Sequence, residues 1–430
     1  MKQYNQDNYI EWIGVIPSSW KISKIGELYT VKNIKVSDID YPPLSVTKNG
    51  ILPQLENAAK SDAHDDRKLV NKGDFVINSR SDRRGSCGIS SLDGSVSLIN
   101  TVLSPKIVLD SEYYNWLFHT APFADEFYKW GHGIVDDLWT TNWQNMKNIK
   151  IPIPSLEEQN HISNFLNRKC IFIDSLINDE IIACEKLAEY KLSLITEVVT
   201  KGLNTNVPMK DSSIKWIGKI PEHWEVDKLK NISQIKPSNV DKKSKDYEPP
   251  VLLCNYTDVY NNEFITNNLE FMKATASYDQ IAKLSLDVGD VIITKDSESP
   301  EDIAVPAIVT EELENVVCGY HLAVIKSDTK QILPKFLFRS LESDKINKQF
   351  ELGANGITRF GLGTYPISNA YICKPPLKEQ IEIIDYLDKR CNPIDSLISE
   401  KKQRIDKLEE YKNSLIFEYV TGKKEVPNEI

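Results

Sequence analysis

The spacing of apolar residues divides the chain into two kinds of segment. In the first kind, short apolar runs are broken by Gly, Pro, Asn and Asp, which is typical of strands and turns. Runs at 75–78, 102–108 and 322–325 predict strands, and longer mixed segments predict helices over 113–130 and 334–352. In the second kind, Gly and Pro are nearly absent and apolar residues recur at steps of three and four, which predicts long amphipathic helices.

The helical kind of segment occurs twice. A first long helix is predicted from about 171 to 200. Asn392 suits an N-cap and Pro393 the first helical position, so a second long helix is predicted from about 393 to 420, after a shorter helix from about 378 to 389. A helix of roughly 30 residues is about 45 Å long. Apolar residues singled out on the two stripes are Leu176, Leu187, Tyr190, Leu194, Leu397, Leu408, Tyr411 and Leu415.

Two interpretations of these heptad-like stripes are open. Each helix could lie on its own globular part, or the two helices could pack on each other. Two equivalent stripes in one chain favour the second arrangement, an antiparallel coiled coil.

Several motifs occur twice in the same order. Trp-Ile-Gly-x-Ile-Pro-x-x-Trp stands at 12–20 and at 216–224, with six of nine positions identical. Such self-similarity indicates a tandem duplication. The other repeated motifs are Gly-Asp before an apolar run at 73–77 and 289–293, Pro-x-Leu-x-Glu-Gln at 154–159 and 375–380, and Ile-Asp-Ser-Leu-Ile at 173–177 and 394–398.

The duplication predicts an α/β (α+β) fold made of two globular domains in tandem, each followed by a helical region. The expected boundaries are 1–155 for the first globular domain, 156–205 for the central helical region, 206–376 for the second globular domain and 377–430 for the C-terminal helical region. A chain of 430 residues is long enough for at least two cores.

Composition narrows the functional classes. No run of about 18 apolar residues occurs, and the first residues lack a signal-peptide core, so no membrane association is expected. Seven scattered cysteines without a Cys-x-x-Cys pair favour reduced thiols in the cytoplasm. The net charge of −10 argues against DNA binding, unless local basic loops or partner subunits supply the positive charge.

Catalytic signatures are missing from the sequence. It contains no phosphate loop, no His-Glu-x-x-His site, no nucleophile elbow and no Asn-Pro-Pro-Tyr segment, and its six histidines do not cluster. The stretch Glu342-Ser343-Asp344-Lys345 superficially resembles part of a nuclease motif, but it falls in a predicted helix and has no counterpart in the first copy. A solvated helix face is the favoured interpretation, and neither a catalytic residue nor a metal site is predicted.

Three loops in each copy offer polar, basic and aromatic side chains. The run 78–86 contains three Arg and three Ser, which suit phosphates and guanine edges. The corresponding run 294–299 is much less basic. Candidate DNA-contacting residues in the first copy are Thr47, Lys48, Asn49, Ser79, Arg80, Arg83, Arg84, Trp139, Thr140 and Asn142. Those in the second copy are Asn255, Tyr256, Thr257, Lys295, Thr358, Arg359 and Tyr365.

The alternative for any one loop is an ordinary surface loop, with Trp139 and Trp143 partly in the core. The comparison of the copies is more informative, because the framework motifs repeat whereas the loops differ. Two similar domains that read different sequences would show this contrast.

The ordered motifs resemble the specificity (S) subunit of type I restriction-modification systems, over nearly the whole chain from about Trp12 to Thr421. The resemblance rests on the two Trp-Ile-Gly openings, the two Gly-Asp strands and the two Pro-x-Leu-x-Glu-Gln segments. It implies that each globular part is a target recognition domain for one half of a split, asymmetric DNA sequence. It also implies that the helices, with the stripe residues given above, fix the distance between the half-sites and dock the modification subunits.

The resemblance also implies partners. Double-stranded DNA, two modification (methyltransferase) subunits and two restriction/translocase subunits are expected, with S-adenosylmethionine, ATP and Mg²⁺ on the partners and no cofactor on this chain. The chain itself would not be an enzyme. Two alternatives are a stand-alone two-headed adaptor and a nuclease or methyltransferase with an unrecognised site, and the missing motifs argue against the latter.

Overall fold

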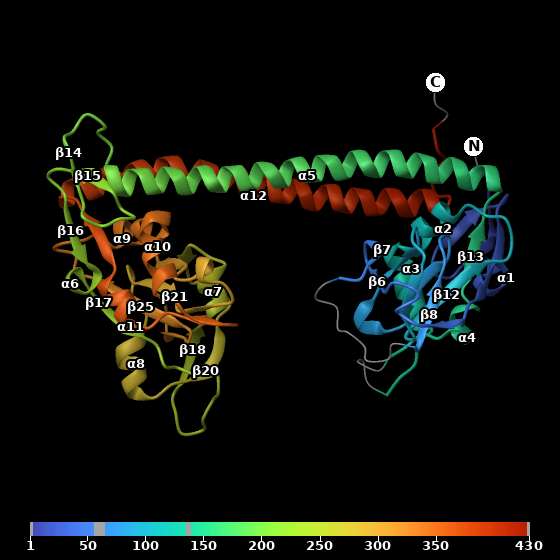
Figure 1. Cartoon of the computed structure of the whole chain (residues 1–430), viewed down its shortest axis with the longest axis horizontal. Helices are drawn as coiled ribbons and strands as arrows, with labels where there is room; N and C mark the ends of the chain where they lie inside the picture. Colours follow the sequence, from blue (N-terminus) through green and yellow to red (C-terminus); the bar gives the residue numbers. More distant parts are fainter. Residues whose placement is uncertain (1–2, 56–64, 135–138, 428–430) are drawn as a thin grey trace. The chain divides into compact units, whose positions relative to one another are not determined.

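The computed structural model describes residues 3–55, 65–134 and 139–427, and it divides into two compact units (Figure 1). Unit 1 comprises residues 1–181 and 403–430, and unit 2 comprises residues 182–402. Each unit therefore contains one globular part and pieces of both long helices. The fold is mixed α/β in both units, as the alternation of sequence textures predicted.

The central sheet of unit 1 is antiparallel and has the strand order β10-β9-β12-β4. A three-stranded sheet, β11-β8-β5, and three strand pairs, β1-β2, β6-β7 and β13-β3, accompany it. The strands are β1 Tyr4–Ile10, β2 Gly14–Pro17, β3 Lys21–Lys24, β4 Tyr29–Val31, β5 Lys35–Val36, β6 Leu44–Thr47, β7 Gly50–Pro53, β8 Arg67–Val70, β9 Phe75–Asn78, β10 Cys87–Ile89, β11 Gly94–Ser97, β12 Asn100–Pro105 and β13 Lys150–Ile153. The short helices are α1 Ile25–Leu28, α2 Ser111–Phe118, α3 Ala121–Lys129 and α4 Trp143–Met146, with a 3-10 turn η1 at Ser81–Arg83.

Unit 2 repeats this plan with a five-stranded sheet in the order β17-β25-β21-β23-β19. Sheets β20-β18-β24 and β22-β27-β26 and the pairs β14-β15 and β16-β28 accompany it. The strands are β14 Met209–Asp211, β15 Lys219–Pro221, β16 Glu225–Lys228, β17 Ser233–Pro237, β18 Pro250–Cys254, β19 Phe264–Ile265, β20 Met272–Thr275, β21 Val291–Thr294, β22 Asp296–Ser297, β23 Pro306–Val309, β24 Val316–Cys318, β25 Leu322–Ser327, β26 Asn355–Gly356, β27 Phe360–Gly361 and β28 Tyr371–Lys374. The short helices are α6 Leu229–Ile232, α7 Tyr256–Tyr260, α8 Tyr278–Leu284, α9 Pro334–Glu342, α10 Asp344–Gly353 and α11 Thr364–Asn369, with a 3-10 turn η3 at Pro300–Asp302.

The predicted strands correspond to β9, β12 and β25, whereas each of the two predicted mixed helices is divided in two. The first is interrupted at Thr120, whose hydroxyl accepts a hydrogen bond from the Phe123 N–H and so caps α3. The second is interrupted at Ser343, which has an extended backbone between α9 and α10.

Each long helix extends beyond the range that was predicted from its apolar stripe. Helix α5 runs over Leu156–Lys201 and α12 over Leu377–Val420, so the shorter helix predicted before Asn392 is part of α12. The predicted helix start at Asn392-Pro393 is wrong, because Pro393 lies inside α12. Pro393 is exposed while Cys391 and Ile394 are buried. Water can therefore reach the carbonyl that the proline leaves without a partner, and the packing of its neighbours offsets a cost of about 3 kcal/mol.

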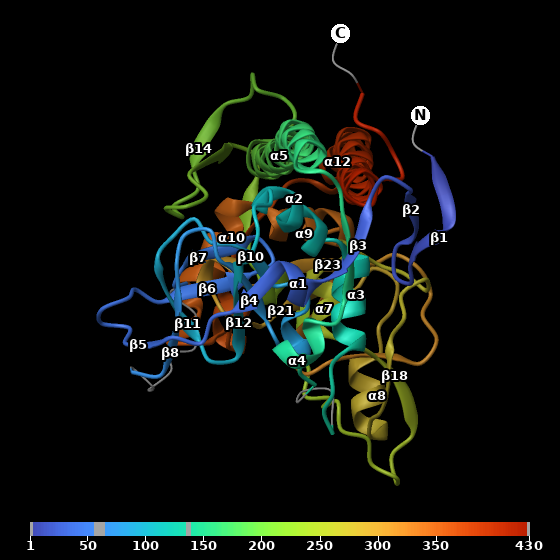
Figure 2. The same ribbon diagram turned by 90° about the vertical axis from the view of Figure 1, so that its right-hand side faces the viewer.

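Within each unit, pieces of the two long helices lie side by side and antiparallel (Figures 1 and 2). In unit 1 Lys412 pairs with Asp174 and Arg404 with Glu180, so residue numbers rise along one helix as they fall along the other. In unit 2 Lys191 pairs with Asp395. The helix ends also enter the globular cores: Ile173 and Val420 belong to the core of unit 1. Parts of each helix therefore pack on the other helix, and other parts pack on a globular core, so both arrangements considered for the apolar stripes occur.

The repeated tryptophan and Glu-Gln motifs contact each other in both units. The indole Nε1 of Trp20 donates to Glu158 at 2.8 Å, and that of Trp224 donates to Glu379 at 2.9 Å. Both tryptophans are buried. The motifs therefore anchor the start of each long helix to the strands at the beginning of its own globular part.

The glutamines of the same motif are buried and hold the backbone. Gln380 Oε1 accepts from the Leu333 N–H at 2.8 Å, and its Nε2 donates to the carbonyls of Gln331 and Pro375, each at 2.9 Å. Gln159 accepts from the Asp110 N–H and donates to the Pro154 carbonyl, each at 2.9 Å. Buried amides with this many partners fix the entry to the helix.

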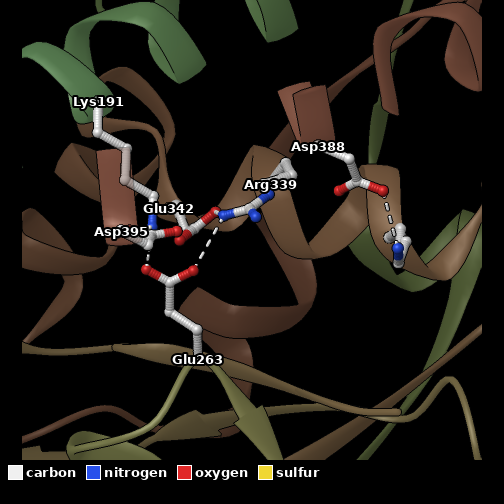
Figure 3. Close-up of polar contacts among 7 residues, drawn as sticks. Lys191, Glu263, Arg339, Glu342, Asp388 and Asp395 are labelled. Atoms are coloured by element: carbon white, nitrogen blue, oxygen red, sulfur yellow. Dashed lines mark hydrogen bonds and ion pairs between the residues drawn. The ribbon is translucent and has the colours of Figure 1, made fainter. Parts of the chain in front are cut away.

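A partly buried charge cluster connects the globular part of unit 2 to its helical pieces (Figure 3). Glu263 accepts from both Lys191 and Arg339, and Arg339 also pairs with Glu342 at 2.8 Å. Burial raises the pKa of the Glu342 carboxyl to about 7, although Arg339 acts in the opposite direction. The prediction that Glu342 lies on a solvated helix face is wrong, because its side chain is only 13% exposed and serves this cluster.

Candidate nucleic-acid interface

In unit 1, two loops predicted separately form one small sheet. Thr140 forms antiparallel bridges with Arg80 on one side and with His132 on the other. The Thr141 N–H donates to the Ser79 carbonyl at 2.9 Å, which extends the pairing. The loop after β9 and the residues before α4 are therefore adjacent, as a shared binding surface requires.

Arginine and aromatic side chains surround this small sheet. Trp139 stacks on Tyr128 with ring centroids 5.6 Å apart, and its Nε1 donates to the Tyr128 carbonyl at 2.9 Å. The Arg84 guanidinium lies 5.3 Å from the Tyr128 ring centroid and pairs with Asp125. Arg80 and Arg83 are exposed. Trp139 thus supports the surface while being half-buried, and the arginines provide its positive charge.

The remaining predicted residues of unit 1 differ in access. Lys48 and Asn49 are exposed at the turn of the β6-β7 hairpin, whereas the Thr47 hydroxyl accepts from the Asn49 N–H and donates to the Gly50 carbonyl. Asn142 is exposed and caps α4. Ser79 is buried, and its hydroxyl lies 3.0 Å from that of Thr101, so it faces the sheet interior instead of solvent.

Unit 2 contains a matching small sheet. Gly361 pairs with Asp296 on one side and with Asn355 on the other. The Leu362 N–H donates to the Lys295 carbonyl at 2.7 Å, as Thr141 does to Ser79 in unit 1. Thr358 and Arg359 are exposed in the turn between β26 and β27. Tyr365, on α11, is 79% exposed.

The loop at Asn255 is a helix start. Asn255 and Asp258 form a capping box at the beginning of α7. Tyr256 stacks on Tyr260 with centroids 5.4 Å apart, and Thr257 is exposed. Burial is the main cause of the raised pKa of Tyr256, which the Ser297 hydrogen bond and Arg359 counteract.

Lys295, one of the predicted DNA-contacting residues, is half-buried and its ammonium group contacts residues of its own unit. Its Nζ is 3.3 Å from the Ser238 carbonyl and 5.5 Å from the Tyr320 ring centroid, and burial lowers its pKa. The structure adds Tyr320, 54% exposed, and His321, whose Nδ1 lies 2.7 Å from Asp296 Oδ2. Neither residue was among the DNA-contacting residues predicted from the sequence, although both directly precede strand β25.

The predicted spacer residues fall into two groups. Leu415 is buried in the core of unit 1, Leu408 and Leu194 pack against the cores of units 1 and 2, and Leu187 is half-buried. The others are exposed, with fractions of 37% for Leu176, 49% for Tyr190, 46% for Leu397 and 56% for Tyr411. Some stripe residues therefore pack into the globular cores, whereas others expose apolar side chains to solvent.

None of the helices in the described ranges is both long enough and apolar enough to cross a membrane. Among the same residues, no group of three or more His, Cys, Asp or Glu side chains could hold a metal ion.

Comparison with known proteins gives consistent matches. A specificity subunit of the type I restriction enzyme MjaVIII from Methanocaldococcus jannaschii is 25% identical, over 100% of this chain and 98% of its own length. A putative type I restriction enzyme MjaX specificity subunit from the same organism is 24% identical, over 98% and 97%. A solved chain, from work on complex assembly and conformational transition of the type I R-M system, has a TM-score of 0.66 at 14% identity, covering 95% of this chain and 99% of that chain.

The family match covers both copies of the repeat. Residues 17–183 and 221–409, well over half of the chain, match the type I restriction modification DNA specificity domain. The matched segments begin within the repeated tryptophan motifs and extend into the long helices. The chain therefore belongs to the family of type I restriction-modification DNA specificity subunits.

Proposed function

We propose that each globular part reads one half of a two-part, asymmetric DNA sequence. The observation that carries this proposal is the matched small sheet in the two units, Arg80-Thr140-His132 in one and Asp296-Gly361-Asn355 in the other. The backbone pairing is shared while the side chains differ in charge and shape. Equal frames with different side chains suit two domains that distinguish different bases.

The long helices suit a spacer. At 1.5 Å per residue, the 46 residues of α5 form a rod of about 69 Å. The Trp20–Glu158 hydrogen bond holds the start of α5 to the core of unit 1, and Ile195, Val198 and Val199 near its end are buried in the core of unit 2. The Lys191–Asp395 and Lys412–Asp174 pairs join α5 to α12. A rod held at both ends sets the gap between two half-sites.

Matched exposed apolar residues on the two helices suit two copies of one partner. Leu156 and Leu377 are 41% and 37% exposed, Leu176 and Leu397 are 37% and 46% exposed, and Tyr190 and Tyr411 are 49% and 56% exposed. The members of each pair occupy the same position in the repeat. Exposed apolar side chains arranged in this way favour docking of protein over contact with DNA. The proposed occupants are two modification subunits.

The partners would supply what this chain lacks. Two modification subunits would bind S-adenosylmethionine and methylate adenine, and two restriction subunits would use ATP and Mg²⁺. The net charge of −10 means that the chain alone has little electrostatic attraction for phosphates. Partner subunits that enclose the DNA would provide affinity, while this chain provides specificity.

The test compares the purified chain with the chain assembled with its modification subunits, on DNA that carries the host's methylated sequence. The chain alone should bind weakly and lose binding steeply with salt, whereas the assembled complex should bind that sequence specifically. Tight, specific binding by the chain alone at about 200 mM salt would contradict the need for partners.

A further inference from the structure

The residue two positions beyond strand β9 in unit 1, and two positions beyond strand β21 in unit 2, carries opposite charges in the two units. It is Arg80 in unit 1 and Asp296 in unit 2, one residue beyond Ser79 and Lys295. The carbonyls of those preceding residues accept the equivalent hydrogen bonds from Thr141 and Leu362. The backbone pairing therefore defines Arg80 and Asp296 as the same position, independently of any sequence alignment of the loops.

Both side chains lie on the face shared by their cross-strand neighbours. Directly paired residues in antiparallel strands point to the same face of the sheet. Arg80 thus shares a face with Thr140 and His132, and Asp296 with Gly361 and Asn355. Arg80, His132 and Asn355 are exposed, and the Asp296 side chain is 29% exposed, so this face is accessible in each unit.

The Asp296 carboxylate is held from one side. Its Oδ2 lies 2.7 Å from His321 Nδ1, and the His321 side chain is 34% exposed. On the other side stands Gly361, where even an added methyl group would lie 3.4 Å from Oδ1. His321 therefore fixes the orientation of the carboxylate, and the glycine leaves Oδ1 uncovered by a neighbouring side chain at that position.

These two arrangements suit opposite base edges. An arginine donates hydrogen bonds to the two acceptors of guanine in the major groove, whereas a carboxylate accepts from the cytosine amino group. We propose that Arg80 and Asp296 are equivalent base-reading residues, Arg80 selecting guanine in one half-site and Asp296, positioned by His321, selecting cytosine in the other. This inference rests on the proposed function and names the residues that make the two half-sites differ.

The test uses the full chain assembled with its modification subunits and measures methylation over a library of DNA sequences. The substitutions are Arg80→Gln, Asp296→Asn, His321→Ala and His321→Asn. Asp279→Asn is the matched control, because it makes the same chemical change on exposed α8 of unit 2. The urea midpoint of each variant verifies that it is folded.

Arg80→Gln should relax one guanine position in one half-site, and Asp296→Asn one cytosine position in the other. Each change should lower discrimination on the order of 10-fold or more and leave the opposite half-site unchanged. His321→Ala should relax the same cytosine, and His321→Asn, which keeps an N–H for Asp296, should restore part of the preference. Asp279→Asn should preserve both half-sites.

The failures are distinguishable. A wild-type complex that methylates no two-part sequence contradicts the proposed function itself. A wild-type two-part sequence that folded Arg80→Gln and Asp296→Asn variants read unchanged contradicts this inference alone. If His321→Ala has no effect where Asp296→Asn does, the positioning role of His321 is wrong.

Discussion

Lys191 Nζ lies 2.6 Å from Asp395 Oδ1, and Lys412 Nζ lies 2.6 Å from Asp174 Oδ1. Each pair joins a lysine late in one long helix to an aspartate early in the other, at the same positions of the repeat. The surroundings differ. The Lys191 side chain is 8% exposed and also binds Glu263, whereas that of Lys412 is 24% exposed.

Substitution of these two lysines should have unequal effects. Lys191→Met leaves Glu263 and Asp395 without their shared cation, and we expect a loss of roughly 2–3 kcal/mol, less than for a fully buried pair because both carboxylates are partly exposed. Lys412→Met should cost at most about 1 kcal/mol. Urea denaturation measures both, and equal losses would show that burial does not distinguish the pairs.

The motif glutamines should be structural. Gln380→Ala removes three hydrogen bonds from a buried position, and each backbone group left unsatisfied costs about 1–3 kcal/mol. Gln403, on the exposed part of α12, is the matched control, and Gln403→Ala should change stability by less than about 0.5 kcal/mol. Comparable urea midpoints for the two variants would contradict a stabilising role for the Gln380 hydrogen bonds.

Substitution at one of the two proposed docking positions should remove only one modification subunit. Leu176→Glu and Leu397→Glu place a charge at equivalent exposed positions, so each should remove one modification subunit without lowering the urea midpoint. The double variant should remove both. Native mass spectrometry or light scattering measures the stoichiometry, and a Leu176→Glu complex that still carries two subunits would argue against this docking surface.

The helices should set the gap between half-sites. Inserting four residues into α5 near Ile182 and four into α12 near Lys402 lengthens the rod by about 6 Å, or about two base pairs. We expect a longer gap and unchanged half-sites in the methylated sequence. The control is the same insertion after Asn204, an exposed loop residue beyond α5, which should leave the gap as it is. A gap that ignores the helix insertions rules out the spacer role.

The duplication made much of the fold predictable. Motifs repeated in one order predicted two α/β parts and two long helices, and the structure explains the motifs, since Trp20 and Trp224 bind the glutamates that begin those helices. The helix start at Asn392-Pro393 was wrong because local signals cannot show that buried neighbours offset an exposed proline. Tertiary packing decided that boundary.

The candidate site was less predictable for a related reason. Arg80 and Thr140 were both predicted, but only backbone pairing shows that they are adjacent. Lys295 was chosen for its charge, and its position beside Tyr320 and Ser238 depends on contacts distant in sequence. His321 was missed because its partner Asp296 is 25 residues away. The sequence of one loop shows which residue types it contains, but a binding site depends on which loops lie next to each other in the fold.

We infer that this chain gives a type I system a two-part DNA target. The most direct measurement is the genome-wide adenine methylation of a host with and without the gene. Removal of the gene should abolish methylation of one sequence made of two different specified halves separated by a fixed unspecified gap. Methylation that is unchanged, or a lost target that is continuous and palindromic, would contradict it.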